Sequence, residues 1–109
     1  MAIVNLTKFR LVIGGIDVPS TGLASCHTWS RPVDRHDGVQ LIVQRYCDVI
    51  GLPDPAPGVL YVVGERVAES AWATGRTDVA YPCTEIVDVG GCHLGYVNLA
   101  VNPARGGLT

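Results

Sequence analysis

The sequence has no cluster of basic residues and little charge of either sign. Its eight Lys and Arg residues are dispersed among ten Asp and Glu residues, which leaves a net charge of −2, and Lys8 is the only lysine. Binding to a phosphate backbone without sequence preference requires clustered basic side chains. We therefore expect no nucleic-acid partner.

Long hydrophobic runs are also missing. No stretch approaches the roughly 18–20 consecutive apolar residues of a membrane-spanning helix. The first charged residues, Lys8 and Arg10, lie inside an apolar pattern instead of before it, which is not the order found in a signal peptide. We expect no membrane partner, a protein that stays in the cytosol where it is made, and reduced cysteines.

The common catalytic and nucleotide-binding motifs are absent as well. There is no G-x-S-x-G nucleophile elbow, and the glycine pairs lack Walker or dinucleotide-binding spacing. The sequence pairs none of the three histidines, His27, His36 and His93, with an evident nucleophile and orienting group. We predict a protein that is not an enzyme and needs no cofactor; the enzyme alternative predicts turnover.

Two Cys-His pairs, Cys26-His27 and Cys92-His93, raise the question of zinc. Zinc sites usually contain two cysteines separated by two to four residues, because a short turn then directs both thiolates at one ion. Adjacent residues of a strand point to opposite faces, so an extended Cys-His pair cannot chelate a metal with both side chains. We interpret the four cysteines as small hydrophobic residues and predict no metal site.

Strand signals dominate what is present. Segments rich in β-branched residues alternate with Gly, Pro and Asp, as expected for short strands joined by turns. They predict strands at residues 2–6, 8–13, 16–18, 23–30, 39–52, 59–63, 78–81, 84–89 and 93–101. The pair Arg31-Pro32 is predicted to end the fourth of these, and Asp37-Gly38 to form a hairpin turn before the fifth.

One segment has the periodicity of a helix, at about residues 65–74. Val67, Ala68, Ala71 and Trp72 form a single apolar stripe, and Gly75 is suited to the left-handed conformation that closes a helix. The proline-rich segment 51–58 before it is interpreted as a surface loop.

Together these elements predict an α+β, β-rich fold. The expected architecture is a mostly antiparallel, bent sheet or partly closed barrel of about six to eight strands with one short helix. The length suits one domain. We place a single compact domain at residues 1–103 and a flexible tail at 104–109.

The arginines carry the remaining chemical signal. Arg31 lies in a predicted loop and Arg76 follows the helix, with Asp78 two residues later. One interpretation is that each arginine caps a carbonyl group or pairs with a nearby carboxylate. The other is an anion pocket, because guanidinium groups bind phosphate with two parallel hydrogen bonds, with an aromatic residue such as Tyr81 stacked on a base.

Six segments resemble a family of small proteins encoded by tailed phages and prophages, mostly of unassigned function. The matching segments are VNLT (4–7), PSTG (19–22), GLPDP (51–55), LYVVGERVA (60–68), RTDVAYP (76–82) and GYVNLAV (95–101). The chain departs from the family pattern at Thr77, where the family has an aspartate.

The resemblance implies a phage gene product that acts in the host bacterial cytoplasm or in the virion. The expected function is counter-defence, by a homo-oligomer that sequesters an anionic, nucleotide-like small molecule. Arg76 and Arg31 would donate to phosphate, Asp78 would orient Arg76 or accept from a ribose, and Tyr81 would stack on the base. The alternatives are a structural or accessory virion protein, and an inhibitor that binds a host protein directly.

Overall fold

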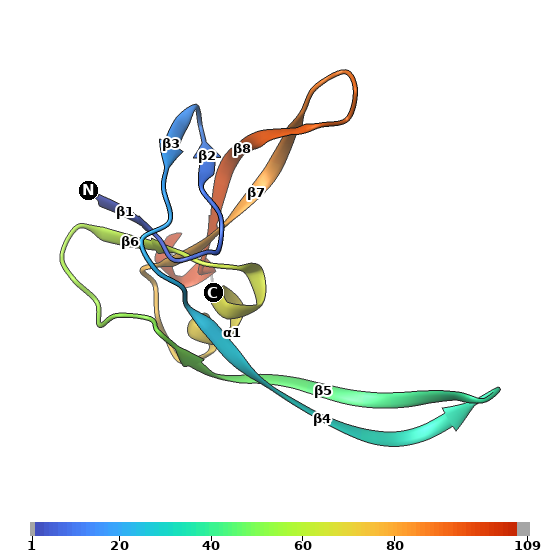
Figure 1. The fold of residues 1–109 in the computed structure, drawn as a ribbon. Helices are drawn as coiled ribbons and strands as arrows, with labels where there is room; N and C mark the ends of the chain where they lie inside the picture. The colour runs from blue at the N-terminus through green and yellow to red at the C-terminus, as the bar shows by residue number, and fades with distance from the viewer. Residues whose placement is uncertain (1, 107–109) are drawn as a thin grey trace.

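The structure is a computed structural model that describes residues 2–106, without the side chains of residues 46 and 47 (Figure 1). It contains a six-stranded mixed sheet, one α-helix, and a separate two-stranded sheet that projects from this body. None of the helices in the described part of the chain is long and apolar enough to cross a membrane.

The six-stranded sheet has the strand order β1-β6-β7-β8-β2-β3. Its strands are β1 (Ala2–Asn5), β2 (Leu11–Ile13), β3 (Ile16–Val18), β6 (Val59–Val62), β7 (Val79–Val87) and β8 (His93–Val101). The pairs β1–β6, β6–β7 and β2–β8 are parallel, whereas β2–β3 and β7–β8 are antiparallel.

The two edges of this sheet meet, so it forms a nearly closed barrel. A parallel bridge joins Asn5 at the end of β1 to Ser20 just after β3. The backbone amide of Thr21 donates to the Asn5 carbonyl at 3.0 Å, and that of Ala24 donates to the Leu6 carbonyl at 2.9 Å. Closure removes the unpaired edges that an open sheet would expose.

Helix α1 (Glu65–Ala73) begins directly after β6 and packs on the sheet. Val67, Ala68 and Ala71 are buried along one stripe, as their spacing predicts. The backbone amides of Gly75 and Arg76 donate to the Trp72 and Ala71 carbonyls, and Gly75 has φ +94°, so the helix ends where the sequence indicates. The main core forms between this stripe, Tyr61, Val63 and Val79.

The two-stranded sheet is a long antiparallel hairpin, β4 (Ser25–His36) and β5 (Val39–Ile50), which we call the arm. It contacts α1 near its base and extends far from the body (Figure 1). The radius of gyration of the Cα atoms is accordingly 16.4 Å, whereas a compact chain of this length has about 13 Å.

The arm corrects one sequence-based boundary. The strand predicted at 23–30 does not end at Arg31-Pro32 but continues to His36, and the hairpin turns at Asp37-Gly38 as predicted. Pro32 is tolerated because the ladder shifts register between Pro32 and Asp34, and because β4 has only one neighbour. Proline is found in strands at such bulges and edges.

Other predicted boundaries differ as well, since the strand predicted at 8–13 begins only at Leu11. The strands predicted at 78–81 and 84–89 are one strand, β7, in which Thr84 has φ +62° and the pairing with β8 shifts register between Ile86 and Val87. The predicted tail 104–109 begins inside a 3₁₀ turn, Pro103–Gly106, where Arg105 Nη1 donates to the Thr77 carbonyl at 2.8 Å; residues 107–109 lie outside the described residues. The predicted fold class, a β-rich bent sheet or partly closed barrel with one short helix, is confirmed.

Candidate functional site

Arg76 and Asp78 form the best-defined ion pair of the described residues. Arg76 Nε donates to Asp78 Oδ1 at 2.7 Å and Nη2 donates to Oδ2 at 2.8 Å. The two side chains are only 20% and 17% exposed. This is the two-pronged geometry that makes an arginine–carboxylate pair strong.

The same arginine connects three segments that are far apart in the sequence. Its Nη2 also donates to the Pro53 carbonyl at 3.0 Å, and its own carbonyl accepts from Asn102 Nδ2 at 2.9 Å. The hydrogen bond to Arg76 lowers the pKa of Asp78, and the same bond raises the pKa of Arg76. Arg76 therefore has a structural role, as the first interpretation of the sequence proposed.

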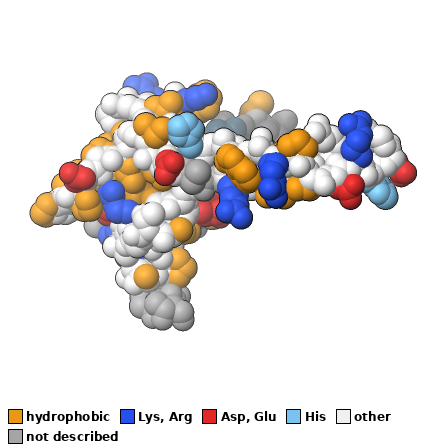
Figure 2. Space-filling model, turned by 90° about the horizontal axis from the view of Figure 1, so that it is seen from below, with side chains coloured by type: hydrophobic (Ala, Val, Ile, Leu, Met, Phe, Trp, Pro, Cys, Tyr) orange, Lys and Arg blue, Asp and Glu red, His pale blue; other side chains and the backbone are white. Residues whose placement is uncertain are grey.

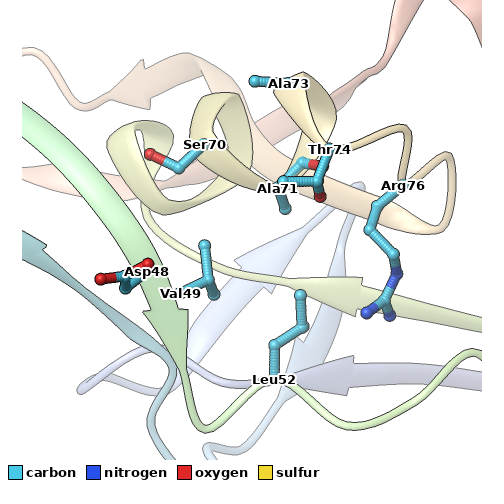
Figure 3. Close-up of a pocket in the computed structure, with 8 residues that line it drawn as sticks. All are labelled: Asp48, Val49, Leu52, Ser70, Ala71, Ala73, Thr74 and Arg76. Atoms are coloured by element: carbon cyan, nitrogen blue, oxygen red, sulfur yellow. The ribbon is translucent and has the colours of Figure 1, made fainter.

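A cavity of about 490 Å³ lies beside this pair, between the base of the arm and the end of α1 (Figure 3). Asp48 and Leu52 line it from one side, and Ser70, Thr74 and Arg76 from the other. The volume is in the range of small-molecule pockets. Its charged lining residues are one carboxylate and one guanidinium, and Asp78 already neutralises the guanidinium. A phosphate would thus find no surplus of positive charge here.

Tyr81 and Arg31, the other two predicted ligand residues, do not line this cavity. Tyr81 lies on β7, where its ring packs against Trp72 with centroids 5.6 Å apart, and it lines a separate, largely apolar groove of about 560 Å³. Burial raises the pKa of Tyr81, and the carboxylates of Glu65 and Glu69 raise it further. Arg31 lies on the exposed arm, with its guanidinium 5.9 Å from the Trp29 ring centroid. The structure brings together only Arg76 and Asp78 of the predicted set.

Sequence reasoning missed Asn5, which is the only polar residue among the fully buried side chains that the structure describes. Asn5 Nδ2 donates to the carbonyls of Phe9 (2.8 Å) and Val18 (3.0 Å), and Oδ1 accepts from the Thr7 amide and hydroxyl. Ser20 Oγ donates to the Thr7 carbonyl at 2.6 Å. The segments 4–7 and 19–22 therefore meet where the barrel closes, and their role there is structural.

The outer part of the arm carries exposed residues that do not belong to the core of the body. Directly opposed residues of an antiparallel pair share one face of the ribbon. Four such pairs make up what we call the arm face: Trp29 with Arg45, Arg31 with Val43, Asp34 with Leu41, and His36 with Val39. Both guanidinium groups lie 5.9 Å from the Trp29 ring, which confirms that they share its face.

The arm face has an apolar side chain in each of its four pairs and is exposed to solvent. Trp29 is 47% exposed, and Val39, Leu41 and Val43 are exposed as well. Figure 2 shows hydrophobic and basic side chains next to each other along the arm, and basic, acidic and histidine side chains at its far end. The sequence predicted a strand at residues 39–52, but not that this strand projects from the body.

Metal-ligating side chains are dispersed in the described part of the chain. In residues 2–106, no three His, Cys, Asp or Glu side chains lie close enough together to hold a metal ion, with the side chain of residue 47 left aside. His93 contacts Glu85 at 3.4 Å on the surface of the β7–β8 hairpin. Comparison of the chain with protein-family models, with curated proteins and with solved structures finds no match.

Proposed function

We propose that this chain is a non-enzymatic binding protein of phage type, a structural or accessory component that works as a homo-oligomer through its arm. The observation that supports this most is the arm face: an apolar strip on a hairpin that packs against its own chain only near the base. A two-stranded hairpin is marginally stable in water without a further layer to cover its apolar side. The arm is therefore expected to acquire that layer in an assembly.

Exposed apolar residues outside the arm also support a function in assembly. Large hydrophobic residues are exposed outside the arm as well, among them Ile86, Val87 and Leu94 on the outer part of the β7–β8 hairpin. Isolated exposed apolar residues are ordinary, whereas contiguous groups mark contact surfaces. Two projecting hairpins with apolar residues suit a protein that occupies a place between neighbouring subunits.

The second candidate is counter-defence by sequestration of an anionic, nucleotide-like molecule in the host cytoplasm. The observation that favours it is the cavity of about 490 Å³ beside Arg76, with the hydroxyl groups of Ser70 and Thr74 on its wall. Subunit interfaces can add donors to such a pocket. Within one chain the cavity has no surplus positive charge, so we rank sequestration second to the structural or accessory function.

Native mass spectrometry of the protein purified from bacterial lysate tests both candidates. If the chain is a structural or accessory component, the protein should be a defined homo-oligomer that releases no small molecule after gentle denaturation. Release of a phosphorylated compound would favour sequestration, and Ser70→Trp, which fills the cavity from the helix, should then abolish its capture. A bare monomer at all concentrations, or a stable complex with one host protein, would contradict the proposed homo-oligomer.

A further inference from the structure

The charges on the arm face are ordered along its length. Starting from the body, the first two levels of the arm face carry Arg45 beside Trp29 and then Arg31 beside Val43. The next level carries Asp34 beside Leu41, followed by His36 beside Val39 at the turn. The face therefore has arginines in the half near the body and a carboxylate in the half near the tip, with one apolar side chain at every level.

This order is self-complementary under a two-fold rotation. Successive levels on one face are two residues apart, which is roughly 7 Å along the strand. The two-fold axis lies in the plane between the two stacked faces, runs across the strands and passes midway between the Arg31 and Asp34 levels. Rotation about it exchanges those two levels and reverses the strand direction. It does not exchange the two strands, so β4 lies over β4 and β5 over β5.

We infer that two copies of this chain associate arm face to arm face, antiparallel, about such an axis. Arg31 then meets Asp34 of the partner subunit, twice, on the β4 side of the two levels nearest the axis. On the β5 side of the same levels, Val43 packs on Leu41 of the partner subunit, twice. One level further out, Trp29 covers His36 of the partner subunit. An interface that uses the same patch on both copies is the commonest way in which a homodimer closes.

The opposite face of the arm has a different composition. It presents Ser30 with Gln44, Arg35 with Gln40, and Pro32 with Ile42. A mostly polar face remains in water, whereas two apolar faces stacked about 10 Å apart form a small four-stranded sandwich. The proposed pairing thus provides the layer that each hairpin lacks.

The inference rests on the proposed function, in which the chain forms a homo-oligomer. Charge reversal on the arm face tests the arm-to-arm contact separately from the existence of the oligomer. Arg31→Asp places two carboxylates against each other at both of these symmetry-related contacts, and Asp34→Arg places two guanidinium groups there. Each variant alone should associate about 100-fold more weakly than wild type, since opposed like charges cost several kcal/mol. An equimolar mixture of the two should regain wild-type affinity, because both contacts in the heterodimer are again Arg–Asp pairs.

Size-exclusion chromatography with light scattering over a dilution series measures these affinities. Arg35→Asp makes the same charge change on the opposite face and should leave association unchanged. If both single variants associate like wild type, or if the mixture stays dissociated, the arm-to-arm contact is wrong while the homo-oligomer stands. A wild-type monomer would instead contradict the proposed function itself.

A second pair of variants tests the arm-to-arm contact in case charge reversal disturbs the fold of the hairpin. Leu41 and Ile42 are adjacent on β5, are 42% and 49% exposed, and lie on opposite faces. Leu41→Asp should dissociate the oligomer, and Ile42→Asp should not. Equal association of these two variants would overturn the inference, with circular dichroism confirming that both are folded.

Discussion

At the scale of single residues, Asn5 shows how one polar side chain can determine a closure. Its side-chain amide makes four hydrogen bonds: one joins β1 to the Val18 carbonyl at the end of β3, and three hold the turn at Thr7 and Phe9 that follows β1. The Asn5 side chain itself is fully buried. The buried amide therefore specifies where the two edges of the sheet join.

We predict that Asn5→Ala lowers the free energy of unfolding by about 3 kcal/mol, because buried donors and acceptors lose their partners. Urea denaturation followed by circular dichroism measures this value. Asn98→Ala is the matched control: Asn98 is exposed and makes one side-chain bond of 3.3 Å to Thr84, so its loss should be much smaller. Equal losses for the two variants would contradict the role assigned to Asn5.

The Arg76–Asp78 pair predicts a pH dependence of stability. The pKa of Asp78 is lower in the folded chain than its ordinary value of 3.8. Its contribution is therefore complete above about pH 4 and is lost as the pH falls through the folded pKa. Asp78→Asn should cost about 1–2 kcal/mol at pH 7, because Arg76 loses a partially buried charged partner.

The same variant should approach wild-type stability as the solution is acidified below pH 4, since the wild-type carboxylate is then protonated. Urea midpoints of both proteins at pH 7, 4 and 2.5 test this. Asp17→Asn is a suitable control, because Asp17 pairs with Arg10 at 3.3 Å but is 56% exposed. Such exposed pairs contribute little. A constant difference between Asp78→Asn and wild type at every pH would contradict the assignment.

At the scale of elements, the arm and the body are built on different principles. The body buries one face of each strand or helix, as Val62, Val63 and Val79 illustrate with no exposed surface. The arm has its backbone hydrogen bonds satisfied by its own two strands but buries little side-chain surface. Its persistence as a separate element therefore depends on what covers the arm face.

We predict that the body folds without the outer part of the arm. Replacement of residues 29–45 by an Asn-Gly turn keeps the base of the hairpin, where it contacts α1. The thermal midpoint of the shortened chain should stay within a few degrees of the wild-type monomer, while its ability to form the oligomer is lost. Calorimetry and light scattering measure the two effects; an unfolded shortened chain would show that the arm is part of the folding unit.

At the scale of the whole molecule, the predicted ligand set illustrates what sequence reasoning can assemble. Arg76 and Asp78 are two residues apart after a helix end, so their proximity was predictable from local geometry. Arg31 and Tyr81 are distant in sequence, and nothing local determines that one lies on the arm and the other beside Trp72. The combination of all four residues into one pocket needed long-range information that composition and spacing do not contain.

The sequence by itself determined where most strands lie, where the helix begins and ends, and where the chain turns at Asp37-Gly38. These features follow from side-chain periodicity and from the backbone preferences of glycine, proline and aspartate, which act over a few residues. Only the tertiary structure decided that segments 4–7 and 19–22 close a barrel through Asn5, and that β4 continues past Pro32 into a projecting arm. Both depend on which distant strands pair, and strand pairing is selected by the packing of the whole core.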